Sequence, residues 1–162
     1  MVSYFHRINL MFGGSKMNNE NTIPKFVSIV SITLGCLDLV RGSMHTILLE
    51  YAAKNIAGLD LSASVASDLL RLLGAFGISN YVTGVMLILL GWKARQLALT
   101  MLGVIPVAYL IGTIGIRFNS ASYAVSQAKW GGLLMMTVYM AICIVTFLAG
   151  TIMAQKSSPS SQ

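Results

Sequence analysis

Four long apolar runs, separated by short polar stretches, dominate the chain. Each run has roughly 20 residues or more, the length that a helix needs to cross a hydrocarbon core of about 30 Å. The pattern predicts an all-α polytopic membrane protein, built as a bundle of four transmembrane helices. The expected spans cover about residues 26–48, 72–91, 97–116 and 131–153.

One face of the first span carries small and polar residues in place of large apolar ones. They are three or four residues apart and so form a line along a helix: Ser28, Ser31, Gly35, Asp38, Gly42 and His45. The second span has a similar line of glycines: Gly74, Gly77, Gly84 and Gly91. Because small residues let helix backbones approach closely in a membrane, we expect these two faces to pack together.

The connections predict how the helices follow one another. The stretch 92–96 allows only a tight turn, so the second and third spans are expected to be antiparallel neighbours. Pro106 should kink the third span, since proline cannot donate the helical hydrogen bond. The stretch 49–71 is longer and mixed, which indicates a short helix on the membrane surface. Serines near its end could cap an early start of the second helix: Ser62, Ser64 and Ser67.

The two ends of the chain are expected to be disordered tails, residues 1–25 and 154–162. The stretch before the first span contains residues that resist regular structure, Asn18, Asn19, Glu20, Asn21 and Pro24, and the stretch after Ala154 is rich in serine. Met17 is a second candidate start of translation. The codons for Gly13, Gly14 and Ser15 can resemble a bacterial ribosome-binding site, in which case residues 1–16 would not be translated.

Composition supports the membrane class and argues against nucleic-acid binding. Of the 162 residues, 56% are hydrophobic and only 10% are charged, whereas soluble domains have about a quarter charged residues. The formal net charge of +6 could suggest a nucleic-acid partner. After Asp68, however, the charged residues are isolated lysines and arginines between apolar runs, as expected at the ends of membrane helices.

The lysine and arginine counts predict the orientation. Six of these residues fall on the side of the termini and four on the opposite side, which favours cytoplasmic termini in a bacterial inner membrane. A start at Met17 would make the counts four and four. The compact turn that holds Lys93 and Arg95 would then decide the orientation.

Ionisable residues inside the first span predict a functional site. Asp38 lies about 18 Å along the helix from Phe26, near the bilayer centre, and Arg41 and His45 follow towards the outer surface. Polar residues from other segments are expected to meet them in the outer half. The candidate ligand-binding residues are Asp38, Arg41, His45, Asn80, Tyr109, Glu50 and Arg71. The alternative is a structural Asp38–Arg41 ion pair, because buried charges are normally paired.

Other kinds of chemistry lack the residues that they require. Cys36 and Cys143 do not form a C-x-x-C pair, so a thioredoxin-like mechanism has no support. His45 and Glu50 are five residues apart on different helix faces, and a metal site needs three or four converging ligands. The chain has no Gly-x-Ser-x-Gly motif, phosphate loop or dinucleotide fingerprint. We therefore expect no metal and no cofactor.

The layout resembles that of the small DoxX-like four-helix membrane proteins. The likeness covers roughly residues 26–150 and rests on the glycine-bearing first span, the mixed loop, the stretch Arg71-Leu72-Leu73-Gly74-Ala75, the short basic turn, and a third span with Tyr109 and Gly112. That family includes subunits associated with membrane redox enzymes. The resemblance implies a four-helix fold and assigns no functional residue to this chain.

These observations favour a non-enzymatic accessory protein or a binding protein for a small molecule or lipid. Its expected partners are membrane lipid, a small amphiphilic ligand, and either another membrane protein or a second copy of the chain. One alternative is a quinone-contacting subunit of a membrane oxidoreductase. Another is a lipid-modifying enzyme that uses His45 and Asp38 as acid and base.

Overall fold

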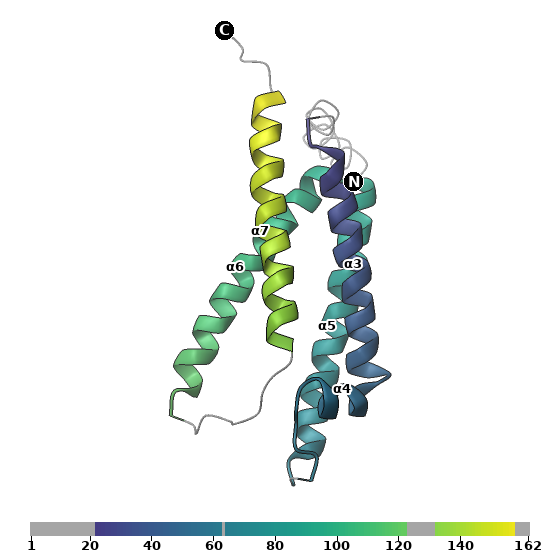
Figure 1. The fold of residues 1–162 in the computed structure, drawn as a ribbon, viewed down its shortest axis with the longest axis vertical. Helices are drawn as coiled ribbons and strands as arrows, with labels where there is room; N and C mark the ends of the chain where they lie inside the picture. The colour runs from purple at the N-terminus through teal and green to yellow at the C-terminus, as the bar shows by residue number, and fades with distance from the viewer. Residues whose placement is uncertain (1–21, 63, 123–131, 158–162) are drawn as a thin grey trace, which may run out of the picture.

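The computed structural model describes residues 22–62, 64–122 and 132–157, and all regular secondary structure within these ranges is α-helical. Four of the helices are long and apolar enough to cross a membrane, so the chain is a multi-pass membrane protein with a four-helix bundle (Figure 1). The fifth is a short helix between the first two spans. The helices are α3 (Lys25–Thr46), α4 (Leu49–Asn55), α5 (Ala66–Lys93), α6 (Arg95–Ser120) and α7 (Gly132–Ser157).

Helices α3 and α5 form the most extensive contact in the bundle, and glycines make it possible. A Cβ atom added to Gly35 would lie 2.7 Å from the Gly84 carbonyl oxygen, and one added to Gly84 would lie 2.7 Å from the Gly35 carbonyl oxygen. Farther along, a Cβ on Gly91 would come within 3.0 Å of the Ser28 carbonyl oxygen. The prediction that the small-residue faces of these helices pack together is confirmed.

The tight turn between the second and third spans is also confirmed. A single residue, Ala94, separates α5 from α6. The Arg95 guanidinium donates a hydrogen bond of 3.1 Å to the Ile23 carbonyl oxygen, just before α3 begins. This bond fastens the α5–α6 turn to the start of α3, at the end of the bundle where α7 finishes (Figure 1).

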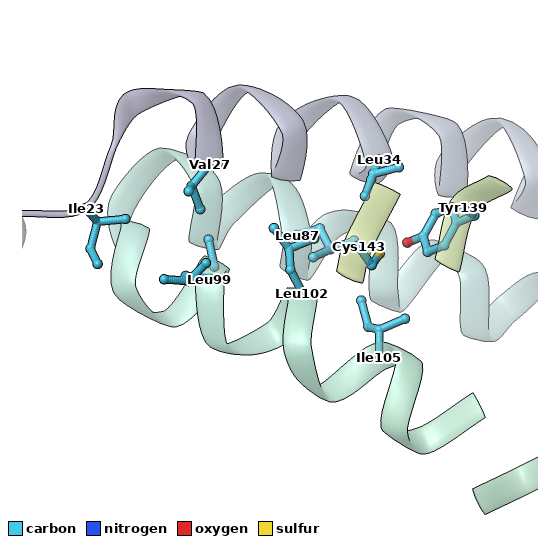
Figure 2. Close-up of a cluster of buried hydrophobic side chains, with 10 residues drawn as sticks. Ile23, Val27, Leu34, Leu87, Leu99, Leu102, Ile105, Tyr139 and Cys143 are labelled. Carbon is cyan, nitrogen blue, oxygen red and sulfur yellow. The ribbon is translucent and has the colours of Figure 1, made fainter. Parts of the chain in front are cut away.

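An apolar core joins the four long helices in the half of the bundle nearest that turn. Figure 2 shows its side chains gathered between the helices. The buried residues of this cluster are Ile23, Val27, Leu34, Leu87, Ala98, Leu99, Leu102, Ile105, Tyr139 and Cys143. Tyr139 is the residue of this cluster that has a hydroxyl group, and this hydroxyl bonds to Asp38.

The second half of α6 separates from the bundle. Ile105 is the last buried residue of α6, and the helix continues unbroken through Pro106. Cβ atoms placed on Gly112 or Gly115 would meet nothing within 4 Å. In Figure 1 this half of α6 leans away from α3 and α5. Beyond Ile105, α6 therefore has no buried residue, and most of its surface is open among the described residues.

Several helix ends differ from the expected boundaries. The expected short helix is present as α4, where Ala52 and Ala53 are buried. Helix α5 begins at Ala66 without a side-chain cap, so the predicted serine cap is wrong. The Ser62 hydroxyl and backbone amide instead donate to the Asp60 carboxylate, and these bonds hold the pKa of Asp60 below its usual range.

The ends of the chain fall mostly outside the described residues. Helix α3 begins at Lys25, and α7 continues to Ser157, four residues past the expected end of the fourth span. Residues 154–157, expected in a disordered tail, are therefore helical. The expectations for residues 1–21, including a start at Met17, and for 158–162 lie outside the described part of the chain.

Candidate functional site

Asp38 of α3 accepts a hydrogen bond at each of its two carboxylate oxygens, one from its own helix and one from α7. The Tyr139 hydroxyl, on α7, donates a hydrogen bond of 2.8 Å to Oδ2. Arg41, one turn along α3, donates from Nη1 to Oδ1 at 3.3 Å. Asp38 is only 2% exposed. Burial of this carboxylate is tolerated because both oxygens accept hydrogen bonds and a cation lies beside them.

Arg41 lies between two aromatic rings. Its guanidinium carbon is 5.7 Å from the ring centroid of Phe76 on α5 and 5.7 Å from that of Tyr139 on α7. These distances fall within the range of a cation–π interaction. The predicted Asp38–Arg41 ion pair is therefore present, and aromatic side chains from two further helices hold its cationic member.

His45 lies one turn beyond Arg41 and meets Asn80 of α5. The Asn80 Nδ2 atom is 3.4 Å from His45 Nδ1. An amide nitrogen is only a donor, so Nδ1 accepts and the ring proton of a neutral imidazole is on Nε2. Asn80 is 5% exposed, and the His45 ring tilts against Phe76 with 5.5 Å between centroids.

A small cavity of about 120 Å³ lies beside these groups. Arg41 and His45 are the polar residues among the described residues that line it, and the others are methionine, phenylalanine, glycine and aliphatic residues. We name it the Arg41–His45 cavity. Its lining residues are Arg41, Met44, His45, Ile56, Ala57, Leu73, Phe76, Gly132, Met135 and Met136.

The structure brings together four of the seven candidate residues: Asp38, Arg41, His45 and Asn80. Glu50 instead forms an exposed ion pair with Lys54 on α4, at 3.0 Å. Arg71 is exposed near the start of α5 and has no ion pair with a described residue. Tyr109 is half-buried against the apolar core, and its hydroxyl has no hydrogen bond to a described residue.

Sequence reasoning missed two aromatic residues of the site. Tyr139 fixes Asp38, and Phe76 contacts both Arg41 and His45. A phenol in the middle of an apolar run needs a hydrogen-bond partner, and that signal could have identified Tyr139. Phe76 gives no such signal, because an apolar side chain in a membrane helix is ordinary.

The geometry limits which reactions the site could perform. Asp38 and His45 have no hydrogen bond to each other, since Asp38 is bonded to Arg41 and Tyr139 while His45 is bonded to Asn80. Among the described residues, no three His, Cys, Asp or Glu side chains lie close enough together to hold a metal ion. Cys36 and Cys143 are free thiols.

Comparisons of the chain with protein-family models, with curated proteins and with solved structures each found no match.

Proposed function

We propose that this multi-pass membrane protein is a non-enzymatic binding protein for a small amphiphilic molecule, held in the Arg41–His45 cavity. The observation that carries the proposal is the composition of that cavity. One part of its wall has the guanidinium of Arg41 and the imidazole of His45, and the remainder is apolar. Ligand sites typically combine an apolar surface with a few placed polar groups.

The size of the cavity limits what enters it. An engineered protein cavity of roughly 150 Å³ accommodates benzene, so a cavity of about 120 Å³ fits a group close to one ring. A whole membrane lipid is too large. The bound molecule therefore places a compact polar end in the cavity, and any longer apolar part extends between the helices or into the bilayer.

The two alternatives differ in their support. A lipid-modifying enzyme with Asp38 and His45 as acid and base is disfavoured, because the carboxylate and the imidazole are each bonded to other partners. A quinone-contacting subunit of a membrane oxidoreductase, as the DoxX-like resemblance implies, is favoured by the exposed second half of α6, which could contact a partner. Purification in mild detergent tests the redox-subunit alternative, because a larger complex with absorbing cofactors would support it.

Filling the cavity should remove the bound molecule without unfolding the protein. Ala57 lines the cavity, and Ala57→Leu would occupy part of its volume. Native mass spectrometry of protein extracted in mild detergent should show a small-molecule adduct on the wild type and none on this variant. Ala75→Leu is the control. Ala75 is exposed on α5, so this variant should retain the adduct. Equal adducts on both variants, or none on the wild type, would contradict the proposed function.

We further propose a bacterial inner-membrane location with cytoplasmic termini. At the end of the bundle where α3 begins, the described charged residues are all basic: Lys25, Lys93, Arg95 and Lys156. The opposite end mixes both signs: Glu50, Lys54, Asp60, Asp68, Arg71 and Arg117. Since lysine and arginine concentrate on the cytoplasmic side, this asymmetry supports the orientation.

Reporter fusions test the orientation directly. Alkaline phosphatase, which is active only outside the cytoplasm, should be active when inserted after Gly58 and inactive when fused after Gln162. Gly58 has a φ of 65° and lies in the connection between α4 and α5. A fluorescent protein that folds only in the cytoplasm should give the reverse result. Activity of the phosphatase at Gln162 would overturn the proposed orientation.

A further inference from the structure

The polar groups that line the Arg41–His45 cavity are hydrogen-bond donors. Arg41 has five N–H donors, of which Nη1 is bonded to Asp38. Among the described residues, no fully buried side-chain nitrogen or oxygen lacks a partner, so the Nε and Nη2 atoms of Arg41, which no described residue accepts from, are not fully buried. His45 accepts at Nδ1 from Asn80, which leaves the Nε2 proton as a second kind of donor.

Among the described residues, the cavity lining has no side-chain oxygen acceptor. None of the ten residues that line the cavity has an oxygen in its side chain. The carboxylate of Asp38, which accepts from Arg41 at Oδ1 and from Tyr139 at Oδ2, is not among the described residues that line the cavity. A molecule that only donates hydrogen bonds, such as an ammonium ion, would therefore meet donors and find no side-chain oxygen acceptor on the described part of the lining.

The charges of the described residues at the site cancel. Asp38 accepts hydrogen bonds at both oxygens, which is the bonding pattern of a carboxylate, and it faces the permanent cation of Arg41. His45 is neutral in the tautomer that its Asn80 contact requires. An added anion would bring a net negative charge into an apolar surrounding, where uncompensated charge is costly.

We infer that the group recognised in the Arg41–His45 cavity is a neutral carbonyl oxygen on a ring-sized body. Its lone pairs accept from Arg41 and from His45 Nε2, and its apolar body contacts Phe76 and the methionines Met135 and Met136. This inference rests on the proposed binding function and specifies its ligand class. Two sources supply such an oxygen: a ketone or quinone ring, and the ester carbonyl of a glycerolipid.

A matched series of small compounds tests the inference on the detergent-purified full chain. The probes are 4-butylcyclohexanone, 4-butylcyclohexanecarboxylate, 4-butylcyclohexylamine and butylcyclohexane, which share the ring and tail and differ in the head group. Titration calorimetry should give the ketone a Kd at least about tenfold below that of the hydrocarbon, since each hydrogen bond to a charged donor adds appreciable affinity. A short-chain diacylglycerol, added as a fifth probe, separates the ester source from the ring source.

Variants link the ranking to the residues. His45→Leu keeps the Asp38–Arg41 pair and removes the Nε2 donor, so it should weaken ketone binding several-fold and leave hydrocarbon binding unchanged. Arg41→Gln combined with Asp38→Asn keeps the site neutral and removes the charged donor, so it should reduce the preference for the ketone, while the His45 Nε2 donor remains. Tyr81→Phe is the control, because the Tyr81 hydroxyl bonds Ser43 and Thr46 away from the cavity.

The outcomes separate this inference from the proposed function. Binding of none of the five probes would overturn both. Tighter binding of the carboxylate or the amine, or equal binding of the ketone and the hydrocarbon, would overturn the carbonyl assignment and leave a binding cavity in place. Diacylglycerol binding that exceeds ketone binding and is lost in His45→Leu would identify the lipid ester as the source of the carbonyl. Ketone binding that exceeds diacylglycerol binding would identify the ring.

Discussion

Replacing Gly84 with leucine is expected to lower the stability of the bundle strongly, because Gly84 lies in the close contact between α3 and α5. A Cβ atom at this position would already lie 2.7 Å from the Gly35 carbonyl oxygen and 3.1 Å from the Leu39 amide nitrogen. Both neighbours are backbone atoms of α3, which cannot move aside as a side chain can. The two helices would have to separate along their whole contact.

The expected cost is at least about 1–3 kcal/mol, the usual range for overpacking a well-filled core. Thermal unfolding in detergent, followed by circular dichroism, measures it. Gly42→Leu should also be destabilising, but less so, because a Cβ there meets the ring of Tyr81, which is a side chain.

The matched control for these variants is Gly112→Leu. Gly112 also lies in a membrane-spanning helix, but a Cβ there would have nothing within 4 Å, so the midpoint should be unchanged. If Gly84→Leu unfolds at the wild-type temperature, the close contact of α3 and α5 is wrong. If Gly112→Leu is as damaging as Gly84→Leu, the surface beyond Ile105 is buried against a partner, not lipid.

The helices could be predicted because membrane spanning imposes strong local rules. A run of about 20 apolar residues must form a helix, since backbone groups inside a bilayer need internal hydrogen bonds. The α3–α5 contact could be predicted for a similar reason: glycines repeated along one helix face are useful only where another backbone approaches. The departure of α6 from the bundle could not, because hydropathy does not distinguish a lipid-facing side chain from one that contacts another helix.

Part of the candidate site could be predicted from the regular geometry of a helix. Asp38, Arg41 and His45 lie within two turns of one helix, so their proximity follows from helix geometry alone. Asn80 followed from depth, since α5 runs antiparallel to α3. Tyr139 required knowledge of which helix lies beside α3 at that depth. Tyr109 was placed at the site by depth alone, yet it belongs to a helix that packs against the apolar core.

Tyr139 changes what can be expected of the ion pair in α3. In Arg41→Leu, the buried carboxylate of Asp38 keeps its bond to Tyr139 but loses its counter-ion, so it must take up a proton or remain charged in an apolar interior. In Asp38→Asn, the new amide oxygen can still accept from Tyr139, and the Arg41 side chain, 15% exposed, keeps its aromatic neighbours and the adjoining cavity. The arginine variant should therefore be the less stable of the two.

A double-mutant cycle with thermal unfolding in detergent measures this asymmetry. Arg41→Leu should cost up to about 3–5 kcal/mol, the range for removing one partner of a buried ion pair. Asp38→Asn combined with Arg41→Leu should regain most of that loss, because no charge is then left unpaired. Lys54→Leu supplies the comparison, since it breaks the exposed Glu50–Lys54 pair and should change stability by less than about 1 kcal/mol.

The cycle also separates structure from binding. If Asp38 and Arg41 serve only to neutralise each other, the stable double variant should bind the cyclohexanone probe as the wild type does. The donor arrangement of the cavity leads us to expect the opposite, a folded protein with a reduced preference for the ketone over the hydrocarbon. A double variant no more stable than Arg41→Leu would show that the two residues are not energetic partners, despite the 3.3 Å between Arg41 Nη1 and Asp38 Oδ1. Arg41 would then be held mainly by the rings of Phe76 and Tyr139.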